Sequence, residues 1–257
     1  METIIFKQQD RIASLILNRP EKRNAFNNIM VKELKEAFAE IEKNEQIRVV
    51  LLKARGPVFS AGADLSYLEM LQGNTFEENL IDSQNLKELF YLIYTYPKPV
   101  IAQVEGAAIA GGCGLATVCD FCYAVPEATF GYTEVKIGFI PALVSVFLSR
   151  KIGEGKARQY LMSGEKIPAE EALTSGLING LFSKENISEK VEELAKRLSL
   201  TTSPAALSLT KQLLAASSGL PMEEALGLAA KYNAEARATP DCKKGISSFL
   251  AKEKIKW

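Results

Sequence analysis

A chain of 257 residues with 47% hydrophobic and 24% charged side chains has the composition of a globular protein with one large core. Its 31 basic and 31 acidic residues balance, which argues against nucleic acid or an anionic membrane as a partner. No stretch approaches the roughly 20 apolar residues of a membrane span, and the start of the chain lacks a signal pattern. We therefore expect a cytoplasmic protein.

The chain contains no histidine, which excludes Ser-His and Cys-His nucleophiles and histidine-based zinc sites. Its 4 cysteines are too few for a disulfide scaffold. Cys119 and Cys122 form a single C-x-x-C between apolar segments, and we interpret them as buried core thiols. We expect no metal and no cofactor, so proton transfer falls to Asp, Glu, Lys, Tyr, Cys or water.

The N-terminal half predicts alternating strands and helices. ETIIFKQQ and RIASLILNR are typical of two paired strands, and Asn27 or Asn28 can cap a helix that runs to Lys43. Strands are predicted at 47–53 and 99–104. Between them, helical periodicity favours a long helix over about 76–94. The buried face of this helix is predicted to consist of Leu80, Leu86, Leu89, Phe90 and Ile93.

The C-terminal half is mainly helical by pattern. Pro141 begins a helix, and the stretch 153–182 predicts two short helices and a strand. Further helices are predicted at 191–198, 204–217, 222–238 and 241–252. These last helices carry Ala and Leu on more than one side, as buried or subunit-facing helices do. We divide the chain into a core of residues 1–186 and a helical region of residues 187–257.

Two glycine-containing turns have the same character. PVFSAGADL lies between a predicted strand and a helix, and VEGAAIAGGCG follows the strand 99–104 and opens a helix at Gly111 or Gly112. The first N–H groups of a helix have no internal partner, and glycines let a carbonyl oxygen approach them closely. Two such turns can direct two amides at one oxygen. Asp64 reads as the cap of the next helix rather than as a catalytic carboxylate.

Three motifs in order, FSAGADL, AIAGGCGLATVCD and FGYTEVKIGFIPA, resemble the enoyl-CoA hydratase/isomerase superfamily, also called crotonases. The resemblance extends from the N-terminal hairpin to the final FLAKEKIKW. It implies an α/β fold of repeated ββα units wound into a superhelix, followed by helices that assemble the subunits and close the pocket. It also implies an acyl-CoA thioester as substrate, no separate cofactor, and a homotrimer or homohexamer.

The resemblance assigns roles to individual residues. The amides of Ala63 and Gly111 correspond to the oxyanion hole that stabilises a thioester enolate, and Glu134 corresponds to the proton-transferring glutamate. We expect apolar neighbours to bury Glu134, namely Phe130, Tyr132, Val135, Ile137 and Phe139. The residues expected to bind the CoA ester are Lys22, Arg23, Ala25, Ala61, Ala63, Asp64, Leu65 and Gly111.

Two departures bear on the reaction. Hydratases of this family usually carry a second glutamate in a G-G-G-x-E motif, where this chain has Gly114. IPALVSVFL replaces the family's I-P-G-x-G-G-T, and its PALVS resembles a bacterial branch of methylglutaconyl-CoA hydratase-like members that also lack that glutamate. Hydration therefore stands first, ahead of double-bond isomerisation by a single glutamate. A non-catalytic acyl-CoA or RNA-binding homologue is a remote alternative. A dinucleotide site fails because Thr117 occupies the third glycine position.

Overall fold

The computed structural model describes residues 1–255 and 257. Residue 256, which belongs to the predicted C-terminal region and to the FLAKEKIKW motif, lies outside the described residues. Within the described part, one sheet has six strands in the spatial order β1 (Ile4–Gln9), β2 (Ile12–Leu17), β3 (Val49–Ala54), β5 (Val100–Val104), β7 (Phe121–Ala124) and β10 (Gly180–Leu181). The same residues form a second sheet of four strands, β4 (Val58–Ser60), β6 (Ala107–Ile109), β8 (Thr129–Gly131) and β9 (Lys166–Pro168).

The strands repeat in pairs along the chain. In each of β3–β4, β5–β6 and β7–β8, the first strand joins the larger sheet and the second joins the smaller one. A helix or 3₁₀ turn follows each pair, and the repeated strands run parallel within both sheets. Antiparallel pairing is found for β1 with β2 and for β8 with β9. This arrangement confirms the predicted ββα superhelix.

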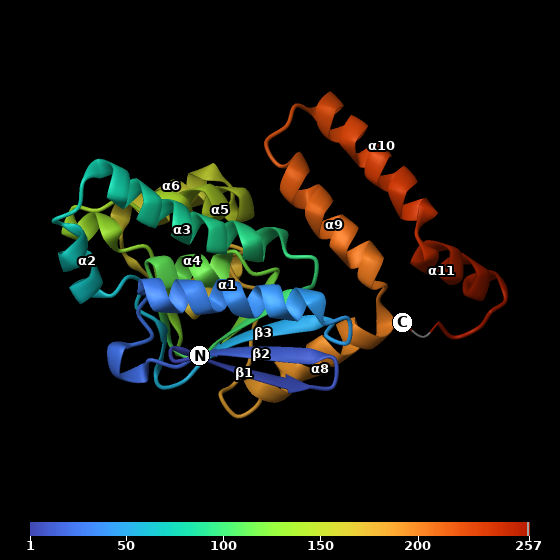
Figure 1. Cartoon of the computed structure of the whole chain (residues 1–257), viewed down its shortest axis with the longest axis horizontal. Helices are drawn as coiled ribbons and strands as arrows, with labels where there is room; N and C mark the ends of the chain where they lie inside the picture. Colours follow the sequence, from blue (N-terminus) through green and yellow to red (C-terminus); the bar gives the residue numbers. More distant parts are fainter. Residues whose placement is uncertain (256) are drawn as a thin grey trace.

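Helices cover the sheets and continue beyond them (Figure 1). Their bounds are η1 (Pro20–Lys22), α1 (Asn28–Lys43), α2 (Leu65–Leu71), α3 (Phe76–Thr95), α4 (Gly111–Thr117), η2 (Glu134–Ile137), α5 (Ala142–Ile152), α6 (Glu154–Ser163), α7 (Ala169–Thr174), α8 (Ile187–Thr201), α9 (Pro204–Ser217), α10 (Met222–Ala238) and α11 (Pro240–Leu250). The predicted helices after 187 are all present. No helix among residues 1–255 and 257 has the length and apolar character needed to cross a bilayer.

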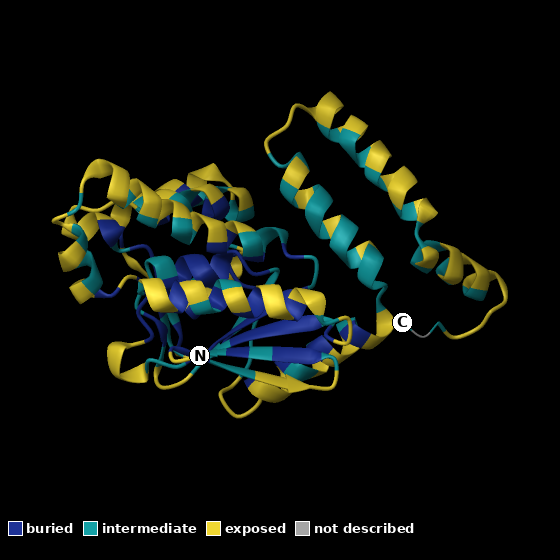
Figure 2. Cartoon of the chain, in the orientation of Figure 1, coloured by how far each residue is buried: buried dark blue, intermediate teal, exposed yellow. Residues whose placement is uncertain are grey.

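The long helix α3 is only partly embedded. Leu89, Phe90 and Ile93 are buried as predicted, but Leu80 is 45% exposed. The prediction for Leu80 is wrong because only the C-terminal part of α3 packs on the core, while its first turns lie at the surface (Figure 2). The first turn of α3 is stabilised by a capping box between Thr75 and Glu78 rather than by packing on the core.

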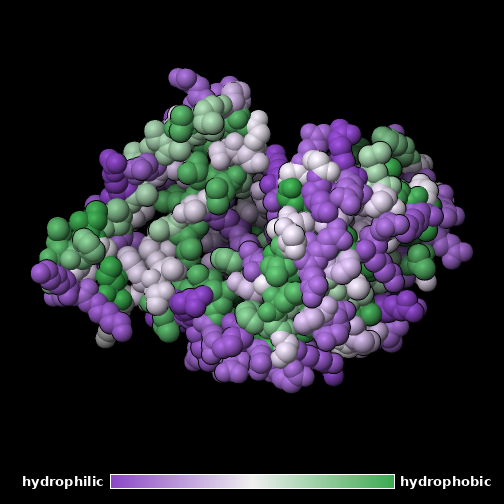
Figure 3. All heavy atoms as spheres, turned by 180° about the vertical axis from the view of Figure 1, so that it is seen from behind, coloured by the Kyte–Doolittle hydropathy of each residue, from purple (hydrophilic) through white to green (hydrophobic). Residues whose placement is uncertain are grey.

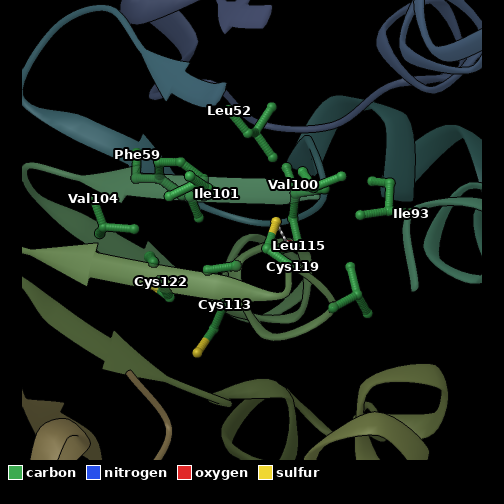
Figure 4. Packing of buried hydrophobic residues seen from close by; sticks show 14 of the residues in the cluster. Leu52, Phe59, Ile93, Val100, Ile101, Val104, Cys113, Leu115, Cys119 and Cys122 are labelled. Carbon is green, nitrogen blue, oxygen red and sulfur yellow. Dashed lines mark hydrogen bonds between the residues drawn. The ribbon is translucent and has the colours of Figure 1, made fainter. Parts of the chain in front are cut away.

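The cysteines of the C-x-x-C pair lie inside the core. Cys119 and Cys122 are 3% and 1% exposed, and Cys119 Sγ lies 3.3 Å from the carbonyl oxygen of Leu115. Figure 4 shows them, with Cys113, among aliphatic side chains of β5 and α4. Burial raises the pKa of the Cys119 thiol, because a thiolate would be poorly solvated there. Their interpretation as core thiols is confirmed.

The C-terminal helices differ in how they pack on the rest of the chain. α8 packs on the larger sheet and buries Ile187, Val191, Ala195 and Ser199. In contrast, α9, α10 and α11 bury none of their side chains in this chain and form an arm beside the body (Figures 1 and 2). We call residues 204–250 the arm.

Candidate active site

The two glycine turns meet in space. Gly62 has a φ of +86°, which favours glycine. A Cβ atom on Gly62 would lie 3.0 Å from the carbonyl oxygen of Ile109 and 3.2 Å from the nitrogen of Gly111. The backbones of the two turns therefore touch, and only a residue without a side chain fits at the contact.

The backbone hydrogen bonds around Ala63 do not use its amide. Phe26 forms a parallel bridge with Ala63, in which the Phe26 amide donates to Gly62 at 2.6 Å and the Asp64 amide donates to Phe26 at 2.8 Å. In a parallel bridge the flanking residues supply these groups, so the N–H of the central residue points to the other side. Ala63 is exposed, so this N–H can meet a ligand.

The second amide belongs to Gly111, the first residue of α4. An N–H at this position has no partner within its helix. The preceding Ala110 has a φ of 52° and a ψ of −125°, a strained conformation for a residue with a side chain. Its own amide is held by the carbonyl of Gly131 at 2.7 Å. Strain of this kind clusters at functional sites, and no sequence pattern predicts it for an alanine.

Glu134 is the first residue of η2 and is 9% exposed. Its Oε2 atom has no hydrogen-bond partner among the described residues. Burial raises the pKa of this carboxyl, and its own backbone amide offsets the rise only in part. Cys113, two residues beyond Gly111, is close enough for the charge of Glu134 to raise the thiol's pKa as a minor cause after burial. The segment that carries Glu134 meets the start of α4, where the Gly131 carbonyl accepts from the Ala110 amide at 2.7 Å.

The surroundings of Glu134 differ in part from those predicted. Phe130 and Tyr132 are fully buried, as expected. Ile137 and Phe139 are 69% and 57% exposed, and Val135 is 38% exposed. These three were expected among the apolar neighbours that bury Glu134, but in this single chain their side chains lie largely at the surface.

Asp64 has a structural role in the turn that precedes α2. Its carboxylate accepts from the Ser66 amide at 3.1 Å and caps α2, which begins at Leu65 as predicted. It also pairs with Arg19 at 2.9 Å. Burial alone would raise the pKa of Asp64, but the hydrogen bonds from Arg19 and Ser66 outweigh it and lower the pKa. The Arg19 pair, which the sequence analysis missed, holds the turn that carries Ala63.

The remaining residues expected to bind CoA gather around this turn. Lys22 and Arg23 are exposed beside it, and the Ala61 amide donates to the Arg23 carbonyl at 3.0 Å. Ala25 is 6% exposed and its carbonyl accepts from Arg19 at 2.7 Å. Leu65 is 75% exposed. The structure thus joins the segments 19–26 and 60–65.

Position 114 is enclosed by its neighbours. A Cβ atom on Gly114 would lie 2.2 Å from Cγ1 of Val144 and 3.2 Å from Cε2 of Phe90. Val144 belongs to the PALVS segment, which the sequence analysis had singled out separately. The two departures are therefore one structural feature, because the valine fills the space that a side chain at position 114 would need.

Comparison with known proteins identifies the family of the chain. The sequence profile of the enoyl-CoA hydratase/isomerase family matches residues 7–257. A Thermus thermophilus protein provisionally named as an enoyl-CoA hydratase is 43% identical over 95% of this chain and 96% of its own. The crotonyl-CoA hydratase of Syntrophomonas wolfei is 34% identical over 98% of this chain and 96% of its own. An enoyl-CoA hydratase structure from Mycobacterium smegmatis, 29% identical, superimposes with a TM-score of 0.92 over 100% of this chain and 99% of its own. The chain belongs to the enoyl-CoA hydratase/isomerase (crotonase) family of enzymes.

Proposed function

We propose that this enzyme adds water across the double bond of a 2-enoyl-CoA thioester. The observation that carries the proposal is Glu134, a buried carboxyl whose Oε2 atom has no hydrogen-bond partner among the described residues. It lies three residues after Gly131, whose carbonyl accepts from the Ala110 amide beside Gly111. A group with these properties is suited to acid-base work, because its raised pKa favours proton exchange near neutral pH.

In this mechanism the thioester oxygen accepts from the amides of Ala63 and Gly111. Glu134 removes a proton from water as the water oxygen bonds to C3, and negative charge moves onto the thioester oxygen as an enolate. The protonated Glu134 then returns a proton to C2, which gives the 3-hydroxyacyl-CoA. Each amide is expected to contribute on the order of a hundredfold to a thousandfold in rate, as single donors do in comparable oxyanion holes.

The CoA and acyl portions have separate neighbours in this proposal. Lys22 and Arg23 are exposed cations beside the Ala63 turn and suit the phosphates of CoA. The exposed apolar side chains of Leu65 and Met70 on α2 and Phe139 after η2 suit an acyl chain. The resemblance of PALVS to methylglutaconyl-CoA hydratase-like proteins supports a branched, dicarboxylic acyl group as one member of the substrate panel.

Isomerisation is the second candidate, and the Gly114–Val144 contact favours it. Val144 fills the space beside Gly114, so no second carboxylate stands there to help Glu134 hold a water molecule. Moving a double bond from C3 to C2 needs only one base, which takes a proton from C2 and returns it to C4. The same two amides would stabilise the negative charge of the dienolate on the thioester oxygen.

The deciding experiment measures hydration and double-bond migration on a panel of 2-enoyl-, 3-enoyl- and methylglutaconyl-CoA esters. We expect hydration in wild-type enzyme, and we expect Glu134→Gln to lower kcat at least a hundredfold while CoA-ester binding stays intact. Migration without hydration would assign the isomerase. An enzyme that binds CoA esters but turns over none would point to the non-catalytic homologue, and full activity in Glu134→Gln would refute the role of Glu134.

We also propose that the arm joins subunits, as a homotrimer or homohexamer. Its exposed apolar side chains include Leu214, Met222, Leu226, Phe249 and Leu250, each at least 62% exposed. Figure 3 shows hydrophobic atoms on the arm, which lies on the left of that view. The main contacts of α10 and α11 within the chain are with α9 and with each other. An apolar surface of this extent is typical of a contact with another subunit.

A further inference from the structure

We infer that Tyr132 and Thr117 are positioning residues for Glu134: the hydrogen bond between their hydroxyls holds the segment that carries the acid-base carboxyl against helix α4. Thr117 is the last residue of α4, and Gly111 is its first. Tyr132 lies between β8 and η2, two residues before Glu134. The inference rests on the proposed function, which gives Glu134 and the Gly111 amide their roles.

The direction of the hydrogen bonds follows from the groups present. The Thr117 hydroxyl lies 2.8 Å from the carbonyl oxygen of Cys113 and 2.7 Å from the Tyr132 hydroxyl. A carbonyl oxygen only accepts, so the single proton of Thr117 is directed at Cys113. The Tyr132 hydroxyl is therefore the donor to Thr117. Both hydroxyls are enclosed, since Tyr132 is 0% and Thr117 is 3% exposed.

Because the Tyr132 hydroxyl donates to Thr117, Tyr132 takes no part in proton transfer by Glu134. Its proton is used in the bond to Thr117, so Tyr132 has none to donate to Glu134. The titratable groups that sense the charge of Glu134 are Tyr132 and Cys113. Burial raises the pKa of both further above neutrality, to about 11 for Cys113. The pair thus faces the carboxyl as neutral groups and acts through geometry rather than charge.

The bond complements a second attachment at the opposite end of α4. There the Ala110 amide donates to the Gly131 carbonyl at 2.7 Å, next to Gly111. Together the two bonds connect both ends of α4 to the segment 131–132. The Thr117–Tyr132 bond is made by side chains, so substitution can remove it while the backbone attachment stays. Tyr132→Phe also removes the contact of the tyrosine hydroxyl with the Cys113 thiol, which Thr117→Val leaves in place.

The kinetic test uses Tyr132→Phe and Thr117→Val, which each remove the bond, and Thr117→Ser, which keeps the hydroxyl. We expect kcat for enoyl-CoA turnover to fall at least about tenfold in the first two, because small displacements of a catalytic group cost this much or more. KM should change less than about twofold, since the CoA contacts lie elsewhere. Thr117→Ser should restore kcat, and the double variant should be no slower than the slower single variant.

Tyr96→Phe is the matched control. Tyr96 is 1% exposed, and its hydroxyl donates to the Phe38 carbonyl at 2.7 Å, between α1 and the end of α3. Removing that hydroxyl should lower the melting temperature about as much as Tyr132→Phe does, without changing kcat or the pH profile. Equal kinetics in Tyr96→Phe and Tyr132→Phe would overturn the inference, as would a Thr117→Ser enzyme as slow as Thr117→Val.

A titration without substrate keeps the inference separate from the proposed function. Glutamate carboxyls are labelled with ¹³C and followed by NMR. The resonance of Glu134 is identified as the one absent from the spectrum of the Glu134→Gln variant. We expect Tyr132→Phe to lower the pKa of Glu134, because a less constrained carboxyl gains solvent. If wild-type enzyme turned over no CoA ester, the proposed function would fail and this titration would still decide the positioning role. An active enzyme in which neither kcat nor the titration responds to Tyr132→Phe would reject the inference alone.

Discussion

At the scale of single residues, two carboxyls of the candidate site have opposite environments. Glu134 is buried, its Oε2 atom has no partner among the described residues, and its pKa is raised, whereas Asp64 is paired with Arg19 and its pKa is lowered. The first arrangement suits a group that must exchange a proton, and the second suits a permanent anion that holds a turn. Their partners thus separate the carboxyl proposed to react from the one that holds the turn.

This contrast predicts opposite pH dependences of stability. A raised native pKa means that the stability contributed by protonated Glu134 is full below its unfolded pKa and is lost as pH rises through the native pKa. Glu134→Gln, which mimics the neutral form, should therefore match wild type in acid and exceed it in free energy of unfolding at pH 8. Urea titrations between pH 4 and 8 measure this difference. A variant less stable than wild type at pH 8 would contradict the burial of the charge.

Asp64→Asn is the control of opposite sign. The lowered pKa of Asp64 contributes stability above its unfolded pKa, and that stability is lost as pH falls through the native pKa. Asp64→Asn should therefore be less stable than wild type at neutral pH and approach it in acid. Urea titrations extended below pH 4, through the range in which the native pKa of Asp64 lies, measure this variant.

At the scale of elements, the contact between α4 and α5 decides what position 114 can hold. We predict that Gly114→Ala lowers the free energy of unfolding by about 1–3 kcal/mol, because overpacking a filled core has this cost. The added Cβ would meet Val144 Cγ1 at 2.2 Å, and shortening that residue in a Gly114→Ala, Val144→Ala double variant should recover part of the loss. Urea unfolding of both singles and the double gives the coupling energy.

Gly155→Ala is the matched control for this cycle. Gly155 lies in α6, and a Cβ there would meet nothing within 4 Å. Alanine at an open helical position should be neutral or stabilise by up to about 1 kcal/mol. Additive effects of the substitutions at 114 and 144 would mean that the two residues do not share the space.

Sequence patterns predicted the elements better than their contacts. Long helices such as α9 and α10 were predicted at their observed bounds, because proline, caps and apolar spacing mark them locally. The three-residue strands of the smaller sheet, including β6 and β8, were not predicted, because so short a segment shows no alternation. The Gly62–Gly111 approach, the Arg19–Asp64 pair and the Val144 filling join residues distant in sequence, and only the fold brings them together.

At the scale of the whole molecule, the body and the arm differ in how they bury apolar side chains. The body has a closed core, while the arm leaves Phe249 and Leu250 at 79% and 76% exposure. These side chains contribute little to the fold of the single chain, so their proposed role in assembly can be tested without unfolding it. Removing them should therefore separate assembly from stability.

We predict that Phe249→Asp with Leu250→Asp converts the protein to monomers of 28.2 kDa, whereas wild type sediments at three or six times that mass. Burying two carboxylates in an apolar contact is unfavourable enough to dissociate it. Met162→Asp provides the control, because Met162 is 73% exposed but lies on α6 of the body, outside the arm. Sedimentation velocity measures the mass, and circular dichroism should show unchanged helix content. A wild-type protein that sediments as a monomer would remove the assembly proposal, and it would leave the exposed face of the arm available for a different partner.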